Sequence, residues 1–361
     1  MSPTAEAVAD RRPVYLTELA QGTARFHEPR RAACPWCGST RLRTRLRTTD
    51  LLQHKPGSFT VDECRGCGHA FQNPRLTPQG LNFYYRDFYD GLHARRIDRV
   101  RVDRVHGTRD ADRRAAAAAR ALFRLAEPES WLDVGTGHGH FPAVAKQVHP
   151  YTAYDGLDVG DAVEQARRDG RVEEAHRGLL TDLAPRLAGR YDAMSMFHYL
   201  EHCLDPREEL KAAHRVLRPG GHLLIELPDP ESHYARVLGR WWLSYFQPQH
   251  LHFIPLTNLR TELRALGYTV VAVDRAEPHV PHDLAAACAL LLGHWLPGAD
   301  EPWRSAAPGS LQRRLRTLLT SASAPLVGAA QAADRALAPL ARRTRFANAY
   351  RVIARRDADR P

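Results

Sequence analysis

Two pairs of cysteines near the start of the chain have the spacing of metal ligands. Each pair is a Cys-x-x-Cys turn followed by glycine, and together they comprise Cys34, Cys37, Cys64 and Cys67. A turn of this kind brings two thiolates together, and two such turns complete a tetrahedral zinc site. Four thiolates leave no open coordination position, so we expect a structural Zn²⁺. The segment between the pairs fits a strand-turn-strand ribbon, whereas the isolated Cys203 and Cys288 are expected to be packing residues.

A glycine-rich turn is the second pattern that could do chemistry. Residues 131–141 read WLDVGTGHGHF, an apolar stretch that ends at Asp133 and breaks into Gly135, Gly137 and Gly139. Glycine lets the backbone turn sharply and lie against a ligand where a Cβ would collide. Pro142 and the apolar residues around it suit the first turns of a helix, whose amide end favours a polar or anionic ligand group. A purely structural strand-to-helix turn would use the same glycines.

Strand-like and helix-like stretches alternate beyond this turn. A second apolar stretch ends at Asp158, about 20 residues beyond the glycines, where a Rossmann-type fold places an acid that binds ribose. Residues 191–196 then suggest a strand, 205–217 a helix and 222–227 the next strand. This alternation predicts a doubly wound, mainly parallel sheet.

The ordered set of motifs resembles the class I S-adenosylmethionine (SAM) dependent methyltransferases. LDVGTGHGHF resembles their first motif, GLD at 156–158 the acid after the second strand, YDAMSMFHYLEHCLDP the fourth strand and its loop, and LRPGGHLLIELP the turn and fifth strand. A nicotinamide dehydrogenase shares the fold but needs GxGxxG, and here His140 stands where the last glycine would fall. The resemblance covers about 130–275. It implies an α/β, Rossmann-like, seven-stranded methyltransferase sheet, with an N-terminal zinc ribbon and a helical insertion before the last strand.

The same resemblance implies which residues hold SAM. Residues of the glycine turn would line the methionine side, Asp158 would hold the ribose, and the loop after the third strand would flank the adenine. Phe197 or His198 would close the pocket. The implied cofactor residues are Asp133, Gly135, Gly137, Gly139, Asp158, Gly178, Leu179 and Phe197.

The cysteine ribbon extends the resemblance to methyltransferases of small molecules and sugars. Many of these carry CPxCG … CxxCGxxF, followed by Pro-Arg and a tyrosine-rich stretch. Here the corresponding residues are 34–38, 64–71, 74–75 and 83–89. The aromatic stretch fits either a buried core or a lid over the substrate cleft, and the sequence leaves both open.

Histidines that follow the fourth and fifth strands are the candidates for a catalytic base. Methyl transfer needs an in-line approach of the nucleophile, and a base with a pKa near neutrality removes its proton. The loops at the carboxyl ends of the strands hold such groups, and the candidates there are His198, His202 and His250. His202 belongs to a Glu-His pair that this family commonly shows, where capping and packing account for it. We therefore expect His250 to be the best placed.

The loop that contains His250 departs from a related pattern. In related sugar C-methyltransferases the comparable loop reads Tyr-His-Glu-His and supplies the base, whereas here it reads Gln247-Pro248-Gln249-His250. Only the last position matches, which puts C-methylation by that mechanism in doubt but leaves O-methylation open. No Asp/Asn-Pro-Pro-Tyr follows the fourth strand, which argues against an amino methyltransferase of the nucleobase or glutamine type.

About 70 residues separate the expected sixth strand (267–273) from the seventh (349–354), where the resemblance implies a short loop. Three helices are expected in this insertion, over 284–295, 311–319 and 327–340. Arginines beside leucines could place 284–340 on an anionic membrane surface, and a helical cap or a homodimer contact would explain the same pattern.

The expected organisation has six parts. They are a flexible N-terminus (1–30), the zinc ribbon (31–75), a helical and aromatic lid and linker (76–127), the SAM-binding core (128–278), the helical insertion (279–345), and the final strand and tail (346–361).

Composition narrows the class of protein further. The chain has 361 residues and a formal net charge of +10. Because Lys55, Lys146 and Lys211 are the only lysines, the basic excess is almost all arginine, and we discount it as evidence for nucleic-acid binding. No stretch approaches the ~18 apolar residues of a transmembrane helix, and the start lacks the apolar core of a signal peptide. We therefore expect a cytoplasmic chain, in which metal binding is favoured over disulfides.

Together these patterns predict a SAM-dependent methyltransferase with a structural zinc ribbon. Its expected partner is a small hydroxylated acceptor, a sugar or a natural-product intermediate, methylated at oxygen or carbon. Two alternatives stay open: an rRNA methyltransferase with a zinc module, and a SAM-binding assembly protein without catalysis.

Overall fold

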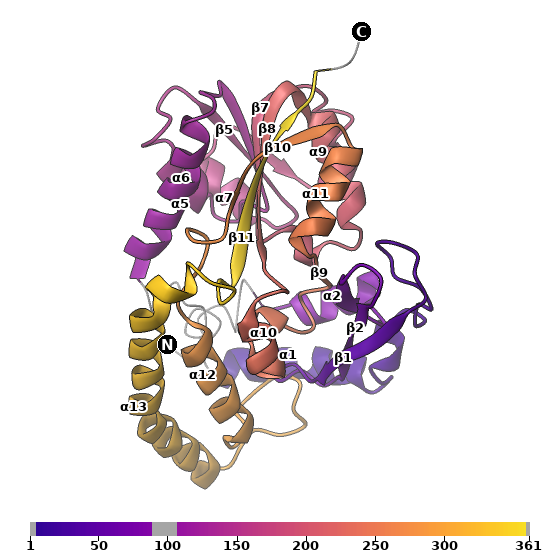
Figure 1. The fold of residues 1–361 in the computed structure, drawn as a ribbon. Helices are drawn as coiled ribbons and strands as arrows, with labels where there is room; N and C mark the ends of the chain where they lie inside the picture. The colour runs from indigo at the N-terminus through magenta and orange to yellow at the C-terminus, as the bar shows by residue number, and fades with distance from the viewer. Residues whose placement is uncertain (1–4, 89–106, 359–361) are drawn as a thin grey trace. The chain divides into compact units, whose positions relative to one another are not determined.

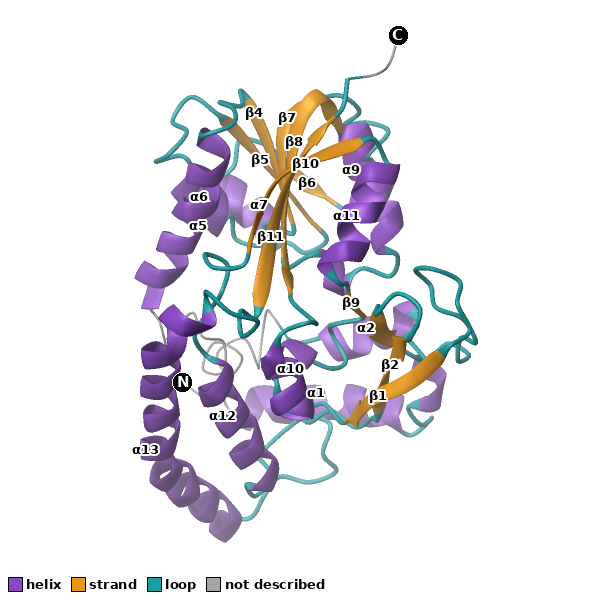
Figure 2. Ribbon diagram, in the orientation of Figure 1, coloured by secondary structure: helices purple, strands orange, loops and turns teal. Residues whose placement is uncertain are grey.

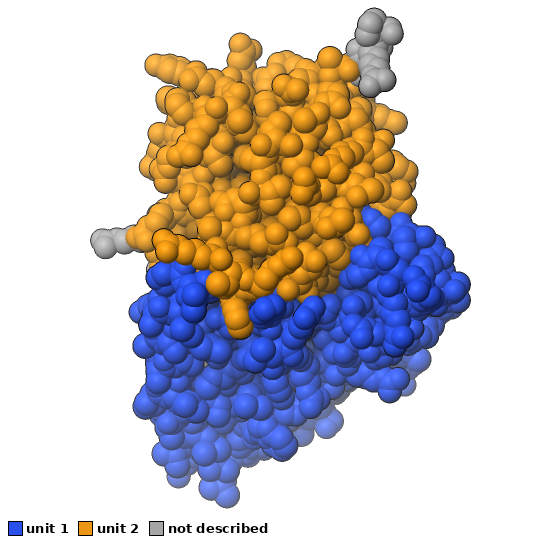
Figure 3. All heavy atoms as spheres, viewed as in Figure 1, with its two compact units in different colours: residues 1–105, 232–251, 280–341 blue, residues 106–231, 252–279, 342–361 orange. Residues whose placement is uncertain are grey.

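The computed structural model describes residues 5–88 and 107–358, which separate into two compact units (Figure 3). Unit 1 comprises residues 1–105, 232–251 and 280–341, and unit 2 comprises 106–231, 252–279 and 342–361. Within the expected lid and linker (76–127), residues 89–106 lie outside the described residues.

The described part of unit 2 is built on a seven-stranded sheet with the order β10-β11-β8-β7-β4-β5-β6. Neighbouring strands from β8 to β6 are parallel, and β11 runs antiparallel to both β8 and β10. The predicted fold class is therefore confirmed, including the last strand that inserts beside the sixth. The strands are β4 (Ser130–Val134), β5 (Ala153–Asp158), β6 (Ala175–Arg177), β7 (Tyr191–Phe197), β8 (Leu217–Pro228), β10 (Tyr268–Asp274) and β11 (Ala349–Arg356).

Helices cover both faces of this sheet, with α5 and α6 on one side and α9 and α11 on the other (Figure 2). The start of α9 shows the local cause: Asp205 accepts hydrogen bonds from the N–H groups of Arg207 and Glu208, and Pro206 occupies the first turn. The helices of unit 2 are α5 (Gly107–Phe123), α6 (His140–Ala145), α7 (Ala162–Arg168), α8 (Leu180–Leu183), α9 (Pro206–Val216) and α11 (Leu256–Ala265); the 3-10 turn η2 (Leu200–His202) and the short strand β9 (His252–Phe253) complete it.

The core of unit 2 centres on Trp131, which is fully buried on β4. Its ring stacks on Tyr154 of β5 at 5.6 Å and contacts Phe141 of α6 at 5.3 Å. Its Nε1 donates to Ser195 Oγ (3.0 Å), so the one polar atom of this large ring is satisfied inside the core. These contacts fix the carboxyl end of β4 relative to both neighbouring strands.

Unit 1 combines a small antiparallel sheet with helices from three separate parts of the chain. Strands β1 (Leu42–Thr48) and β2 (Phe59–Cys64) form the predicted ribbon, and β3 (Ala70–Gln72) pairs with β2. The helices of unit 1 are α1 (Ala5–Leu19), α2 (Pro78–Tyr85), α10 (His233–Val237), α12 (Asp283–Trp295) and α13 (Ser310–Ala341), with 3-10 turns η1 (Ala24–Phe26), η3 (Gly239–Trp241) and η4 (Leu243–Tyr245).

The first residues of the aromatic stretch, which the structure describes, lie in the core of unit 1. Phe83 stacks on Phe26 at 4.6 Å, and Tyr84 is fully buried beside Phe59. The buried Lys55 ammonium donates to three carbonyl oxygens at the end of α2, those of Phe83, Tyr84 and Arg86. One cation therefore satisfies the carbonyl groups that a helix leaves without intrahelical partners.

The insertion contains two helices where the sequence predicts three. The expected helices over 311–319 and 327–340 form the single helix α13, because the alanine- and serine-rich residues between them continue the helical hydrogen bonding. Pro325 and Pro339 lie inside α13, and each removes the intrahelical hydrogen bond that its missing N–H would make. Among residues 5–88 and 107–358, no helix is both long and apolar enough to cross a bilayer.

Candidate functional site

The loop between β4 and α6 contains three residues with left-handed backbone conformation within five positions. Gly135, Gly137 and Gly139 have φ angles of 74°, 52° and 71°. Such angles cost a residue with a Cβ about 1–2 kcal/mol, which explains why glycine alternates here. The N–H of Gly135 donates to the carbonyl of Leu157 at the end of β5 (2.8 Å), so the loop is also tied to the neighbouring strand.

The three glycines are required for different reasons. A Cβ at Gly135 would come within 3.0 Å of the Tyr199 ring, and one at Gly139 within 3.0 Å of Ala166 and Arg171. At Gly137, by contrast, no described atom lies within 4 Å of the added Cβ. Gly137 therefore faces open space at the carboxyl end of β4, where a ligand rather than the protein would exclude a side chain.

Asp158 is held in place by the two loops that flank it. Its Oδ2 accepts the N–H of Gly137 (3.0 Å), and its Oδ1 accepts the N–H of Gly160 (2.9 Å). A carboxylate offers about four lone-pair sites, so both oxygens keep capacity for further donors such as hydroxyl groups. The side chain is only partly buried, which leaves that capacity accessible.

Asp133 is buried directly beneath the glycine turn. Its Oδ1 accepts the hydroxyl of Ser195 (2.5 Å), the residue opposite it in the β4–β7 ladder. Burial raises the pKa of Asp133 to about 7, and the negative charge of Asp158 adds to that increase, while the hydrogen bond from Ser195 opposes it. The site therefore has one carboxyl group that titrates near neutrality.

The remaining predicted cofactor residues lie at the ends of β6 and β7. The N–H of Gly178 donates to the carbonyl of Asp158 (3.0 Å), which brings the β6 loop to the end of β5. Leu179 next to it is half exposed, and Phe197 packs edge-on against Phe141 at 4.7 Å. The structure thus gathers all eight predicted residues at the carboxyl ends of adjacent parallel strands, where open α/β sheets bind ligands.

Two of the three candidate histidines lie in the loop after β7. His198 has a left-handed backbone (φ 51°), and its Nδ1 lies 3.1 Å from Oε1 of the buried Glu201. Partial loss of hydration lowers the pKa of His198, but the hydrogen bond and charge of Glu201 raise it by more, so the pKa lies above its usual value. His202 ends the 3-10 turn η2, with its N–H donated to the carbonyl of Tyr199.

His250 lies in unit 1, in a loop held by buried amides. Its Nδ1 is 2.8 Å from the carbonyl of Ser244, which favours the tautomer that leaves Nε2 as an acceptor. Gln247 Nε2 donates to the His250 carbonyl (2.6 Å), and Gln247 Oε1 accepts from Gln72 of β3 (2.8 Å). The two glutamines, which stand where the related loop has tyrosine and glutamate, are therefore structural, and Gln249 is also fully buried.

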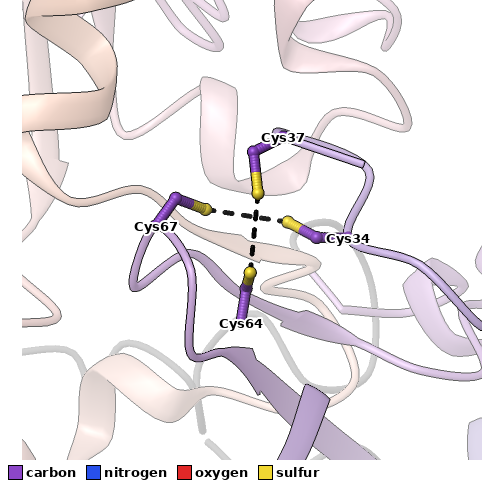
Figure 4. Close-up of side chains that lie close together, drawn as sticks. All are labelled: Cys34, Cys37, Cys64 and Cys67. Atoms are coloured by element: carbon purple, nitrogen blue, oxygen red, sulfur yellow. Dashed lines mark hydrogen bonds between the residues drawn. The ribbon is translucent and has the colours of Figure 1, made fainter. Parts of the chain in front are cut away.

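The four ribbon cysteines converge as predicted (Figure 4). The Sγ atoms of Cys34 and Cys67 are 3.8 Å apart, those of Cys37 and Cys64 are 3.5 Å apart, and all four lie within 4.8 Å of one another. A disulfide would require about 2.05 Å, whereas ligands about 2.3 Å from a tetrahedral Zn²⁺ are separated by about 3.8 Å. The donor set and its geometry fit zinc. Of the other cysteines, Cys203 is buried and Cys288 half-buried.

Sequence reasoning missed two residues that shape the site. Ser195 binds Asp133, and Tyr199 packs against Gly135 while its hydroxyl donates to Glu209 (3.1 Å). The β4–β7 register would have indicated Ser195, because parallel strands place it opposite Asp133. Nothing in the local sequence indicates the contact of Tyr199, which depends on how the β7 loop folds back.

The strand order and the glycine turn together define the class I SAM-dependent methyltransferase fold. Residues 108–273 match the family model described as a methyltransferase domain.

Relatives match over the same part of the chain. An uncharacterized 37.1 kDa protein in transposon TN4556 of Streptomyces fradiae is 33% identical over 168 residues, 44% of this chain and 49% of its own length. The ubiquinone biosynthesis O-methyltransferase of Alkalilimnicola ehrlichii is 31% identical over 129 residues, 34% of this chain and 51% of its own length. The matches thus span about half the length of each relative. The structure of a putative sarcosine dimethylglycine methyltransferase from Galdieria sulphuraria matches with a TM-score of 0.42 and 14% identity, over 68% of this chain and 85% of its own.

The raised pKa of Asp133 predicts a pH dependence of stability. Between the unfolded pKa of about 3.9 and the folded value of about 7, the folded protein holds a proton that the unfolded chain releases. The contribution of Asp133 to the free energy of unfolding is therefore largest below pH about 4. It falls as the pH rises to 7, by up to about 1.4 kcal/mol per pH unit. Urea unfolding at pH 5, 6 and 7 should show this loss in the wild type and a smaller one in Asp133→Asn. Equal pH dependence in the two proteins would contradict the assignment, and the surface variant Asp169→Asn serves as control.

Proposed function

We propose that this protein transfers the methyl group of SAM to a hydroxyl oxygen of a small metabolite. The observation that carries the proposal is the open position at Gly137, whose N–H is bound by Asp158 at the carboxyl end of a parallel sheet. The match of residues 108–273 to a methyltransferase domain supports it, as does the similarity of part of the chain to a ubiquinone biosynthesis O-methyltransferase.

The roles that we propose for the cofactor residues follow from their chemistry. The glycine turn exposes backbone N–H groups and has no side chains in the way, which suits the methionine part of SAM. Asp158 would accept the ribose hydroxyls, and the apolar surface of Leu179 beside Gly178 would lie against the adenine ring. Phe197 would close the pocket over the ligand. SAM, when bound, supplies an electrophilic methyl group on a sulfonium.

We propose His250 as the group that accepts the proton of the acceptor hydroxyl. Its Nδ1 is committed to the Ser244 carbonyl, so Nε2 is the nitrogen that can take a proton. The raised pKa of His198 keeps more of that imidazole charged near neutrality, so His198 suits a proton donor or an electrostatic role better. Gln247 forms hydrogen bonds within the loop and cannot act as a base. Because the loop lacks the other residues of the Tyr-His-Glu-His pattern of C-methyltransferases, we propose oxygen rather than carbon as the methyl acceptor.

Substitution of Gly137 tests the cofactor site. Gly137 and Gly170 both have left-handed backbones, and at neither does a described atom lie within 4 Å of an added Cβ. Gly137→Ala and the control Gly170→Ala should therefore each lose about 1–2 kcal/mol of stability. Only Gly137→Ala should weaken SAM binding, by tenfold or more in Kd, because the new methyl group occupies the space proposed for the ligand. Calorimetry with SAM and with S-adenosylhomocysteine measures both affinities. Wild-type affinity in Gly137→Ala would refute the proposed site.

Substitution of His250 tests the base. His250→Gln should lower kcat by about 10²–10⁴-fold while leaving SAM affinity unchanged, because general-base catalysis supplies gains of that size. The assay measures formation of S-adenosylhomocysteine with a panel of catechols and hydroxylated sugars. The exposed His294, replaced by glutamine, serves as control. If His250→Gln keeps full kcat and His198→Gln does not, the base is His198.

Metal analysis tests the ribbon. We propose that Cys34, Cys37, Cys64 and Cys67 hold one structural Zn²⁺, so purified protein should contain one equivalent by mass spectrometry. Cys37→Ser should lose that zinc and destabilise unit 1, because binding at such sites contributes folding free energy. Cys288→Ser should retain it. Purified protein with no zinc, and no uptake on addition of Zn²⁺, would exclude the site.

A further inference from the structure

The helix α13 carries its large apolar side chains on the exposed side. Leu311, Leu318 and Leu326 are 78%, 65% and 57% exposed, and four further leucines are exposed with them: Leu315, Leu319, Leu337 and Leu340. Separations of three, four and seven residues return to the same side of a helix, so these residues form one continuous face. We call these seven leucines the leucine face of α13.

The side of α13 that packs against the rest of unit 1 carries small and polar side chains instead, and its buried residues are Gln331, Asp334, Ala338 and Ala341. Asp334 accepts hydrogen bonds from the N–H groups of Leu284 (3.0 Å) and Ala285 (2.9 Å) at the start of α12. Gln331 donates to the Pro281 carbonyl (3.1 Å), and Arg316 donates to that of Pro297. A surface helix normally buries its apolar stripe and exposes its polar one. In α13 this arrangement is reversed, although the helix lies along α12 (Figure 1).

An exposed tryptophan extends the apolar surface at one end. Trp295, the last residue of α12, is 77% exposed. The first turns of α13 lie near it, because Gln312 and Arg316 bind the carbonyls of Gly298 and Pro297 just after that tryptophan. A tryptophan with an apolar ring and a polar N–H is favoured at the boundary between hydrocarbon and water.

The charge around this face has one sign. Arg314 is exposed at the edge of the leucine face, Arg313 is exposed on the opposite side of the helix, and no acidic residue occurs between 302 and 333. The one acid in α13 is Asp334, which is buried against α12. A second copy of this helix would therefore bring arginine against arginine without a compensating acid. An anionic surface matches the charge instead.

From these contacts we infer that the leucine face of α13, with Trp295, binds the headgroup region of an anionic phospholipid membrane. The helix would lie in the plane of the interface, with leucines toward the acyl chains and arginines at the phosphates. This role needs no spanning helix, and it is independent of the proposed methyl transfer.

Vesicle flotation of the full chain tests this binding. We expect binding to vesicles of phosphatidylcholine with phosphatidylglycerol, at least tenfold weaker binding to phosphatidylcholine alone, and loss of the preference at high salt. Leu315→Glu/Leu318→Glu should reduce binding at least tenfold. Arg313→Glu/Arg314→Glu should abolish the preference for the anionic lipid. The control Val237→Glu replaces another exposed apolar residue of unit 1 and should bind as wild type.

Two results would overturn the inference. One is equal or absent binding of the wild type to both kinds of vesicle. The other is a concentration-dependent dimer in sedimentation that Leu315→Glu/Leu318→Glu dissociates, which would assign the leucine face to a second copy. Calorimetry with SAM and circular dichroism show whether each variant is folded. If the glutamate pair unfolds the chain, the arginine pair and Leu315→Ser/Leu318→Ser answer the same question.

Discussion

The hydrogen bond from the Gly137 N–H to Asp158 is the interaction on which the candidate site depends. It joins the turn after β4 to the acid after β5, and it forms only because the backbone is left-handed on alternate residues. A Cβ at Gly135 or Gly139 would come within 3.0 Å of neighbouring side chains, so the protein packs closely against both positions. The turn leaves the space at Gly137 open, which is the structural condition for a cofactor to approach the backbone.

The core beneath the turn supports that geometry and also sets its electrostatics. Trp131 binds Ser195, and Ser195 binds Asp133, so a polar chain runs from the aromatic core of the sheet to the floor of the site. Burial of Asp133 in this position raises its pKa, and the cost of that burial is reduced because the Ser195 hydroxyl binds the carboxyl. Packing and site chemistry are therefore inseparable at the end of β4.

Unit 1 is stabilised differently from unit 2, because its small sheet cannot supply a large apolar core. The four cysteines, the Lys55 ammonium at the end of α2 and the buried glutamines around His250 each bring distant parts of its chain together. These contacts join polar and sulfur atoms, and they supplement the aromatic core around Phe83 and Phe26. The leucines of α13 are accordingly free for the outer face, which a helix packed by its apolar side could not offer.

Local spacing by itself determined much of this protein. The cysteine pairs, the glycine turn, Asp158 and the alternation of strands and helices follow from turn geometry and hydrophobic period, whereas the order of the strands was implied by the resemblance to methyltransferases; the structure contains each of them. Local spacing did not predict the hydrogen bonds of the His250 loop, the partner of Asp133 or the contact at Gly135. These contacts are made by Gln72, Ser195 and Tyr199, which come from other parts of the chain. The two helices expected over 311–340 form one, because the residues between them remain helical, and Asp334 and Arg316 connect α13 to the start of α12 and to the carbonyl of Pro297. Sequence period records which residues share a face, but only tertiary contacts decide which face is turned inward.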